Sequence, residues 1–253
     1  MMDFSAPPPA IIIPAPKKLI VPDVPKLIFP ALGGSFAALL NQEGAAGCGP
    51  LPTIKASGGG ANTVSGGQTS HTINIPAARA SGDILLAVMV FASNSNATWP
   101  AGWTSFLGTD NRISGAWRRS DGTETTVVPT SPNDESAHFI LVIGCVSVAA
   151  TPIVGSFVSG SGTSCDPALL TPSWTTVPTL YIAVGSSLIA PSSLTGTPTG
   201  YSAVTTFIDA TISCPRIGWC WKEVNPGAAD NPSAFTCTSG NNRAATIAIR
   251  GLP

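Results

Sequence analysis

The sequence predicts an all-β protein: a single jelly-roll-like β-sandwich built from two related halves and preceded by an extended, Pro-rich N-terminal arm. Three observations support this fold class. Glycine and proline account for 26 and 24 of the 253 residues, a share typical of chains with many tight turns. Short apolar runs recur between these turns, and no helical periodicity of normal length follows residue 45. A series of motifs also occurs twice in the same order.

The arm, residues 1–34, contains three consecutive octads within residues 7–30: PPPAIIIP, APKKLIVP and DVPKLIFP. Each octad holds a triplet of large apolar residues closed by a proline: Ile11, Ile12 and Ile13; Leu19, Ile20 and Val21; Leu27, Ile28 and Phe29. Proline fixes φ and removes a backbone donor, so we expect extended geometry. Because apolar triplets are costly to leave in water, we predict that they dock on a partner protein. A stiff spacer and an arm lying along its own domain are the alternatives.

Residues 35–62 are predicted to be a Gly-rich linker between the arm and the β domain. The linker begins with a short piece compatible with a helical turn, residues 35–42. Residues 68–75 then alternate as an edge strand does, and Pro76 ends that strand.

The β domain, residues 63–253, contains the related halves, about residues 81–144 and 178–251. The first half reads SGDILLAVMVFAS, PAGWT, GAWRRSDGTE and AHFILVIG, and the second reads PTLYIAVGSSLIA, PTGYS, IGWCWKEVNPG and AATIAIRG. Residues 137–144 are aligned with residues 244–251. Because two copies are too few for a solenoid, the halves are predicted to close on each other.

Three apolar runs set a further requirement on the packing. Residues 84–91, 139–148 and 180–184 are apolar at nearly every position, so both faces of each strand must be covered. The facing sheet covers one face. The arm, a loop or a second subunit is expected to cover the other.

Charge and hydropathy exclude some partners and favour others. A net charge of −1 gives no reason to expect nucleic acid or an anionic membrane surface. The apolar runs fall short of the ~18 residues that a spanning helix needs, and the N-terminus does not resemble a secretory signal. Charged residues make up only 10% of the chain, so we expect a homo-oligomer or dense assembly in which neighbours cover the surface. A tightly turned extracellular β domain is the alternative.

The six cysteines, at positions 48, 145, 165, 214, 220 and 237, show no Cys-x-x-Cys spacing. Neither histidine lies near a cysteine pair, so no metal site and no cofactor is expected. Cys145 lies in an apolar run and is predicted to be a buried thiol. Cys214, Cys220 and Cys237 gather in the second half, where two of them can pair in an oxidising medium.

Catalytic motifs are not evident, and the protein is predicted not to be an enzyme. His71 and His138 are the only histidines, and no nucleophile elbow, P-loop or dinucleotide fingerprint is found. His138 is expected at the edge of a strand.

The aromatic residues suggest one alternative site. Trp99, Trp103 and Tyr201 are predicted in turns, where packing at the start of the next strand competes with stacking on a glycan. Trp219 and Trp221 lie two residues apart and are predicted to share the core face of a strand.

The duplicated series GDILLA, PAGWT, a Trp strand ending in RRSDGTE, and AHFILVIG resembles a recurrent module in virion proteins of tailed bacteriophages. The resemblance covers residues 81–251 and implies a jelly-roll or lectin-like β-sandwich that decorates capsids, necks and tails or forms fibres. It implies no active-site residues. The second half departs from the pattern where Tyr201 replaces Trp and cysteines accumulate.

We therefore expect a structural protein of a bacteriophage particle, made in the cytoplasm of the bacterial host and located in the virion. The expected partners are other virion proteins, which the arm contacts. The alternative is a carbohydrate-binding or host-adhesion module that recognises a host-surface glycan.

Overall fold

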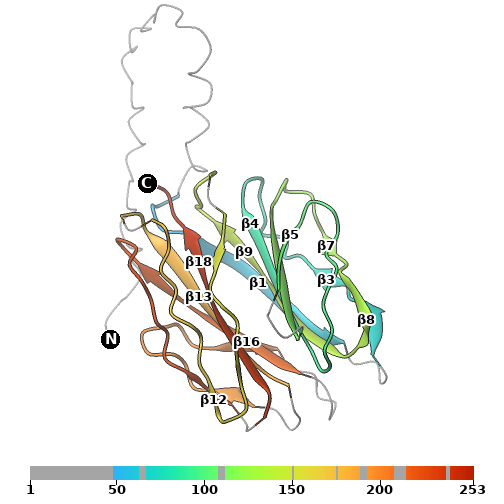
Figure 1. The fold of residues 1–253 in the computed structure, drawn as a ribbon. Helices are drawn as coiled ribbons and strands as arrows, with labels where there is room; N and C mark the ends of the chain where they lie inside the picture. The colour runs from blue at the N-terminus through green and yellow to red at the C-terminus, as the bar shows by residue number, and fades with distance from the viewer. Residues whose placement is uncertain are drawn as a thin grey trace, which may run out of the picture. The chain divides into compact units, whose positions relative to one another are not determined.

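The computed structural model is a β-sandwich in which each large sheet comes from one half of the chain (Figure 1). It describes residues 48–62, 67–107, 112–149, 151–174, 176–188, 193–207, 215–237 and 240–253, all within one compact unit, residues 41–253. Among these residues there are strands and no helix. The predicted all-β sandwich is confirmed. The arm and the predicted helical turn at residues 35–42 lie outside the described residues.

The first large sheet has the strand order β1-β9-β4-β6-β5 and is antiparallel throughout. Its strands are β1 (Thr53–Asn62), β4 (Ile84–Phe91), β5 (Thr104–Leu107), β6 (Ile113–Arg119) and β9 (Ser136–Gly144). All five strands lie between Thr53 and Gly144, so the sheet is complete within the first half.

The second large sheet has the order β10-β18-β13-β16-β15, with β11 also paired to β18. Its strands are β10 (Ile153–Val154), β11 (Val158–Gly160), β13 (Thr179–Ser187), β15 (Thr205–Phe207), β16 (Arg216–Val224) and β18 (Asn242–Arg250). The order β18-β13-β16-β15 repeats the order β9-β4-β6-β5 of the first sheet. The predicted relation between the halves is thus visible in the topology. The likeness to a jelly roll is limited to the two-sheet architecture, since the large sheets exchange no described strands.

The two large sheets pack face to face through one apolar core. Alternate residues of each central strand point into it, as the period of two requires. Residues of the core include Ile84, Leu86, Val88, Phe139, Leu141, Ile182, Val184, Trp219, Ile247 and Ile249. The rings of Phe139 and Trp219 meet across the interface with centroids 6.0 Å apart. Trp221 packs against the same core, which confirms that Trp219 and Trp221 share the core face.

The outer face of each large sheet is covered by small sheets and loops of the same half. On the first sheet these are the pairs β2 (Gln68–Ser70) with β8 (Thr130–Asp134) and β3 (Ile73–Asn74) with β7 (Thr126–Val127). On the second it is the sheet β12-β17-β14, comprising Ser164–Cys165, Phe235–Cys237 and Leu194–Thr195. Every residue of β4, β9 and β13 is buried as a result. The second face of each apolar strand is therefore covered by other segments of the same chain.

Three local predictions were wrong. The linker predicted over residues 35–62 contains β1, a ten-residue strand, because an edge strand tolerates glycine where close packing favours it. The strand predicted over residues 68–75 is divided into β2 and β3, which pair with different strands. The alignment of residues 137–144 with residues 244–251 is displaced by one residue, since Phe139 faces the core whereas Thr246 faces outward.

The prediction of a buried thiol at Cys145 was also wrong. Cys145 forms a disulfide with Cys48, and their Cα atoms are 5.2 Å apart. Strand pairing brings the two together, because Thr53 at the start of β1 lies opposite Gly144 at the end of β9. Cys165, Cys220 and Cys237 are free and buried, and Cys214 lies outside the described residues.

Candidate functional site

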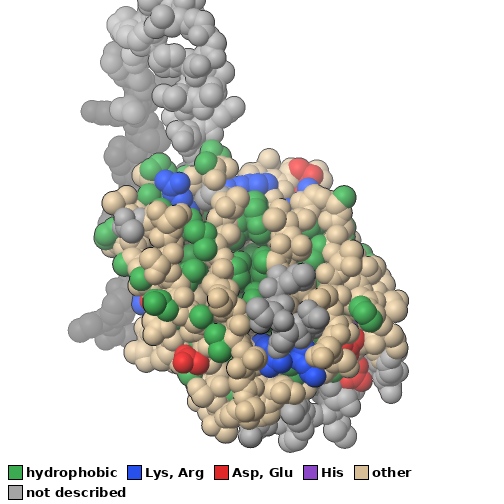
Figure 2. Space-filling view, in the orientation of Figure 1, with side chains coloured by type: hydrophobic (Ala, Val, Ile, Leu, Met, Phe, Trp, Pro, Cys, Tyr) green, Lys and Arg blue, Asp and Glu red, His purple; other side chains and the backbone are tan. Residues whose placement is uncertain are grey.

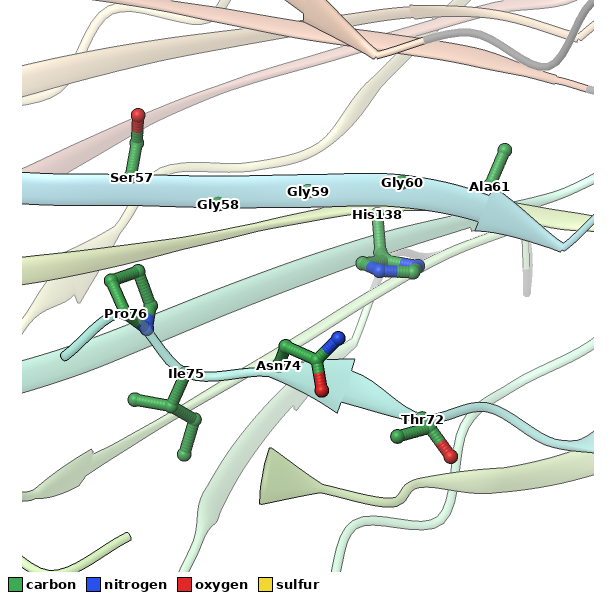
Figure 3. Close-up of a pocket in the computed structure, with 10 residues that line it drawn as sticks. All are labelled: Ser57, Gly58, Gly59, Gly60, Ala61, Thr72, Asn74, Ile75, Pro76 and His138. Atoms are coloured by element: carbon green, nitrogen blue, oxygen red, sulfur yellow. The ribbon is translucent and has the colours of Figure 1, made fainter. Parts of the chain in front are cut away.

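A groove of about 470 Å³ runs beside β1 on the outer side of the first large sheet (Figure 3). One side is the backbone of residues 57–61, and the other is the segment of residues 72–76 that includes β3. His138 of β9 lies between them. None of the lining residues carries a carboxylate, an ammonium or a guanidinium group. The groove is thus polar and uncharged around one imidazole.

Three consecutive glycines form the β1 side of this groove, and they meet different neighbours. A methyl group on Gly59 would lie 2.6 Å from the Phe207 ring on the inner side, so packing requires glycine there. A methyl group on Gly58 or Gly60 would meet its nearest neighbours at 3.5 Å, an ordinary contact distance. Packing therefore does not require glycine at positions 58 and 60, and their small size keeps the groove open.

His138 is 8% exposed and lies directly opposite Gly60 in the pairing of β9 with β1. Its Nε2 atom points toward Gly60, at 3.5 Å from where a Cβ would be. Its Nδ1 atom is buried and has no hydrogen-bond partner within the described chain. Desolvation, with a smaller effect from His71, lowers the pKa of His138 to about 4. The imidazole is therefore neutral at pH 7. The expected position at the edge of a strand was wrong, because β9 begins at Ser136 and His138 lies inside it.

The opposite wall of the groove belongs to a strand that pairs on one side only. Ile73 and Asn74 of β3 pair with β7, and Ile75 N–H donates to the Thr125 carbonyl. By the alternation of a strand, Thr72 and Asn74 turn their backbone groups away from β7. The Asn74 carbonyl lies near Gly58, and Thr72 and Asn74 are among the residues that line the groove (Figure 3).

His71 is fully buried between two serines and does not form an accessible catalytic site. Its Nε2 atom lies 2.7 Å from Ser131 Oγ, and its Nδ1 atom lies 2.9 Å from Ser136 Oγ. The Ser131 hydroxyl donates a hydrogen bond to the Pro132 carbonyl at 2.7 Å. Burial lowers the pKa of His71, against an opposing effect of Asp134. This arrangement ties β2 and β8 to the start of β9.

The structure brings Trp99 and Trp103 together. Their rings are stacked with centroids 5.7 Å apart, and both pack on the outer cluster of the first sheet. Trp99 Nε1 donates to Ser114 Oγ at 3.0 Å. Both rings are half-buried, so packing accounts for a large part of their surface.

Tyr201 occupies the equivalent position on the outer face of the other sheet, away from the Trp pair. Its hydroxyl donates to Asp230, which also accepts from Lys222 Nζ at 2.5 Å. Burial and the bond to Asp230 raise the pKa of Tyr201. The three residues predicted for glycan stacking therefore do not form one surface.

Other reactive groups are enclosed. The thiols of Cys165 and Cys237 hydrogen-bond to each other, which raises the pKa of Cys165 and lowers that of Cys237, and both are at most 3% exposed. Within the described part of the chain, no group of three or more His, Cys, Asp or Glu residues is placed to hold a metal ion. No helix there is long and apolar enough to cross a membrane.

Sequence reasoning did not find the groove. The run SGGGA was assigned to a linker, and His138 was assigned to a strand edge. The signal available in the sequence was a run of three glycines followed closely by a polar strand. Only the pairing of β1 with β9 places the imidazole of His138 beside them. Comparison with protein-family models, curated proteins and solved structures finds no match to this chain.

Proposed function

We propose that this chain is a non-enzymatic structural component of a bacteriophage particle, anchored to neighbouring virion proteins by its N-terminal arm. The observation that carries the proposal is the series of three octads in residues 7–30, each with an apolar triplet closed by proline. Three evenly repeated apolar triplets suit docking across repeated pockets of an assembly better than they suit a solvated spacer.

The β-sandwich supports this proposal by covering its own sheets. Described segments of each half already pack on the outer faces, where they form separate apolar clusters. Within the described residues, the outer faces of the large sheets are therefore already covered by the β domain itself. The face shown in Figure 2 carries few charged side chains among many uncharged ones, which suits contact with neighbouring subunits.

The test measures occupancy, the number of copies of this protein in purified particles relative to the most abundant shell protein, by quantitative mass spectrometry. Removal of residues 1–34 is expected to abolish incorporation. The matched control replaces Lys18 and Lys26 with serine, which leaves every triplet intact and is expected to preserve occupancy. Unchanged occupancy after removal of the arm would contradict the proposal. A wild-type ratio near that of the shell would indicate a decoration protein, and a small fixed ratio would indicate a neck, tail or fibre protein.

Carbohydrate binding or host adhesion is the second candidate function. The structure offers it a polar groove that is separate from the Trp99 and Trp103 pair. This candidate concerns the β domain and is compatible with anchoring through the arm.

A further inference from the structure

We infer that the groove beside β1 is a binding site for a small neutral saccharide, held by His138, Asn74 and Thr72 over a floor made by Gly58 and Gly60. The inference goes beyond a structural role in a particle, because it assigns a ligand to the β domain itself. The volume of the groove, about 470 Å³, lies within the usual range for small-molecule sites.

Uncommitted hydrogen-bonding groups from separate strands converge on the groove. The His138 imidazole is more than nine-tenths buried, lines the groove, and has no hydrogen bond to Nδ1. Nδ1 is itself enclosed by protein atoms, so a ligand in the groove contacts the imidazole through Nε2, which faces Gly60. Asn74 adds a carboxamide, and Thr72 adds a hydroxyl. Imidazole, carboxamide and hydroxyl each combine donor and acceptor capacity, as the hydroxyl groups of a sugar do.

The glycines of β1 indicate that the groove is kept open for a ligand. Packing of the chain against itself requires glycine at position 59 but tolerates a methyl group at positions 58 and 60. Any side chain at those two positions projects into the groove and narrows it. Packing of the chain against itself therefore does not explain why the floor of the groove is open.

The charge of the lining selects against ionic ligands. No carboxylate or cationic side chain lines the groove, so an acidic or basic ligand loses hydration without gaining an ion pair. The depressed pKa of His138, about 4, keeps the imidazole uncharged near neutral pH. A neutral polyhydroxylated molecule fits this setting. An extended peptide fits less well, because strand addition depends on a row of main-chain bonds, whereas the free edge of β3 offers only the backbone groups of Thr72 and Asn74.

The experiment titrates the full-length protein with neutral sugars in ligand-observed NMR and calorimetry. The neutral panel is glucose, galactose, mannose, N-acetylglucosamine and their disaccharides, and the charged panel is glucuronic acid and N-acetylneuraminic acid. At least one neutral sugar is expected to bind. Its affinity is expected to be the same from pH 8 to pH 5 and to fall near pH 4. Gly60→Ala, which places a methyl group over Nε2, is expected to weaken binding at least tenfold. Asn74→Ala is expected to weaken it as well, and Ser105→Ala on exposed β5 is the control.

Several outcomes would overturn the inference: no neutral sugar binds, only the charged panel binds, or affinity persists in both Gly60→Ala and Asn74→Ala. Loss of affinity in Trp103→Ala with no change in Gly60→Ala would move the site to the aromatic pair. Binding of an uncharged extended peptide such as a serine- and threonine-rich nonamer, without sugar binding, would also overturn it. Asn74 is exposed, so its variant keeps the test valid if Gly60→Ala folds poorly. Particle occupancy is measured separately, so failure here does not bear on the arm.

Discussion

At the scale of single residues, the glycines of this chain differ in whether backbone conformation or close packing requires them. Gly102 and Gly200 have φ values of 84° and 80°, which residues with a Cβ rarely adopt. Gly59 lies against the ring of Phe207. Gly58 and Gly60 meet neither requirement. Substitutions at these positions therefore separate backbone strain, overpacking and occupancy of the groove.

Neighbouring glycines in β1 give the first stability prediction. Gly59→Ala pushes a methyl group into Phe207 and is expected to destabilise the fold by about 1–3 kcal/mol. Gly58→Ala has room and is expected to change the free energy of unfolding by no more than about 0.5 kcal/mol. Urea titration followed by Trp fluorescence measures both values. Equal destabilisation by the two substitutions would mean that the assigned faces of β1 are wrong.

His138 gives a prediction about pH. The unfolded chain takes up a proton at this histidine near pH 6.5, whereas the folded chain does so only near pH 4. Between these values the unfolded state binds more protons, so stability falls as the pH is lowered from 6.5 to 4. The loss due to His138 is on the order of 3 kcal/mol.

Removal of this titration tests the assignment. Denaturant titration at intervals of half a pH unit measures the midpoint of unfolding. The decline of this midpoint between pH 6.5 and pH 4 is expected to be smaller in the His138→Gln protein than in the wild type. His71 has a pKa shifted in the same direction and is expected to leave a residual slope. His71→Gln is therefore the matched comparison. A His138→Gln protein with the full wild-type pH dependence would show that His138 is not the buried neutral group.

Sequence patterns located some residues of the core and missed others. Trp219 and Trp221 were placed by the period of two, which depends only on local geometry. The disulfide of Cys145 with Cys48 was missed because it joins positions 97 residues apart and depends on which strands become neighbours. The site at His138 was missed for the same reason, since the residues that line it come from β1, β9 and the segment of residues 72–76.

At the scale of elements, the two turns that precede β5 and β15 are structural copies. In each, the amide of an aromatic residue donates to a proline carbonyl three residues earlier, at 3.2 Å for Trp103 and 3.0 Å for Tyr201. A glycine with positive φ precedes each aromatic residue, as a type II turn requires. Each ring then packs on the outer cluster of its own half. The matching places seen in the sequence therefore reflect a shared packing role.

These paired turns predict paired effects. Gly102→Ala and Gly200→Ala are each expected to destabilise the protein by about 1–2 kcal/mol, because alanine resists the left-handed conformation. Steric clash adds little, since a methyl group at Gly200 meets nothing within 4 Å and one at Gly102 meets only Arg118 at 3.9 Å. Thermal unfolding of the two single variants and the double variant measures the effects. An unaffected Gly200→Ala protein would contradict the equivalence of the turns.

The disulfide belongs to the same scale, because it joins the chain just before β1 to the chain just after β9. Cys48→Ser is expected to lower the free energy of unfolding by about 2–5 kcal/mol, since the bridge closes a long loop in the unfolded chain. Thermal unfolding with and without a reducing agent measures the loss, and Cys220→Ser serves as the control for removal of a thiol. The reducing agent should not affect the Cys48→Ser protein. A wild-type protein that is equally stable in both media would contradict the bridge.

At the scale of the whole molecule, the sandwich is a pairing of two sheets that are each complete in one half of the sequence. The repeated order of motifs predicted this closure, because each half has an apolar face that it cannot bury alone. The strand register was not predictable to one residue, as the displaced alignment of β9 with β18 shows. Some outward positions of these strands are apolar too, among them Ile140, Val142 and Ala248, so the alternation that normally fixes a face is weak.

This architecture predicts how the chain behaves when it is divided. A break after residue 150 leaves all pairs within the large sheets intact, because β1 to β9 lie on one side and β10 to β18 on the other. Each fragment alone exposes the core face that contains Ile84, Leu86 and Leu141 or Ile182 and Ile247, so neither is expected to stay soluble and folded. Co-expressed fragments, residues 41–150 and 151–253, are expected to elute as a 1:1 complex with a β-rich circular dichroism spectrum. Val148→Ala, at a side chain that is 63% exposed beside the break, is the control and should not weaken the complex. A first fragment that is monomeric and cooperatively folded by itself would show that the halves are independent domains and not the two layers of one core.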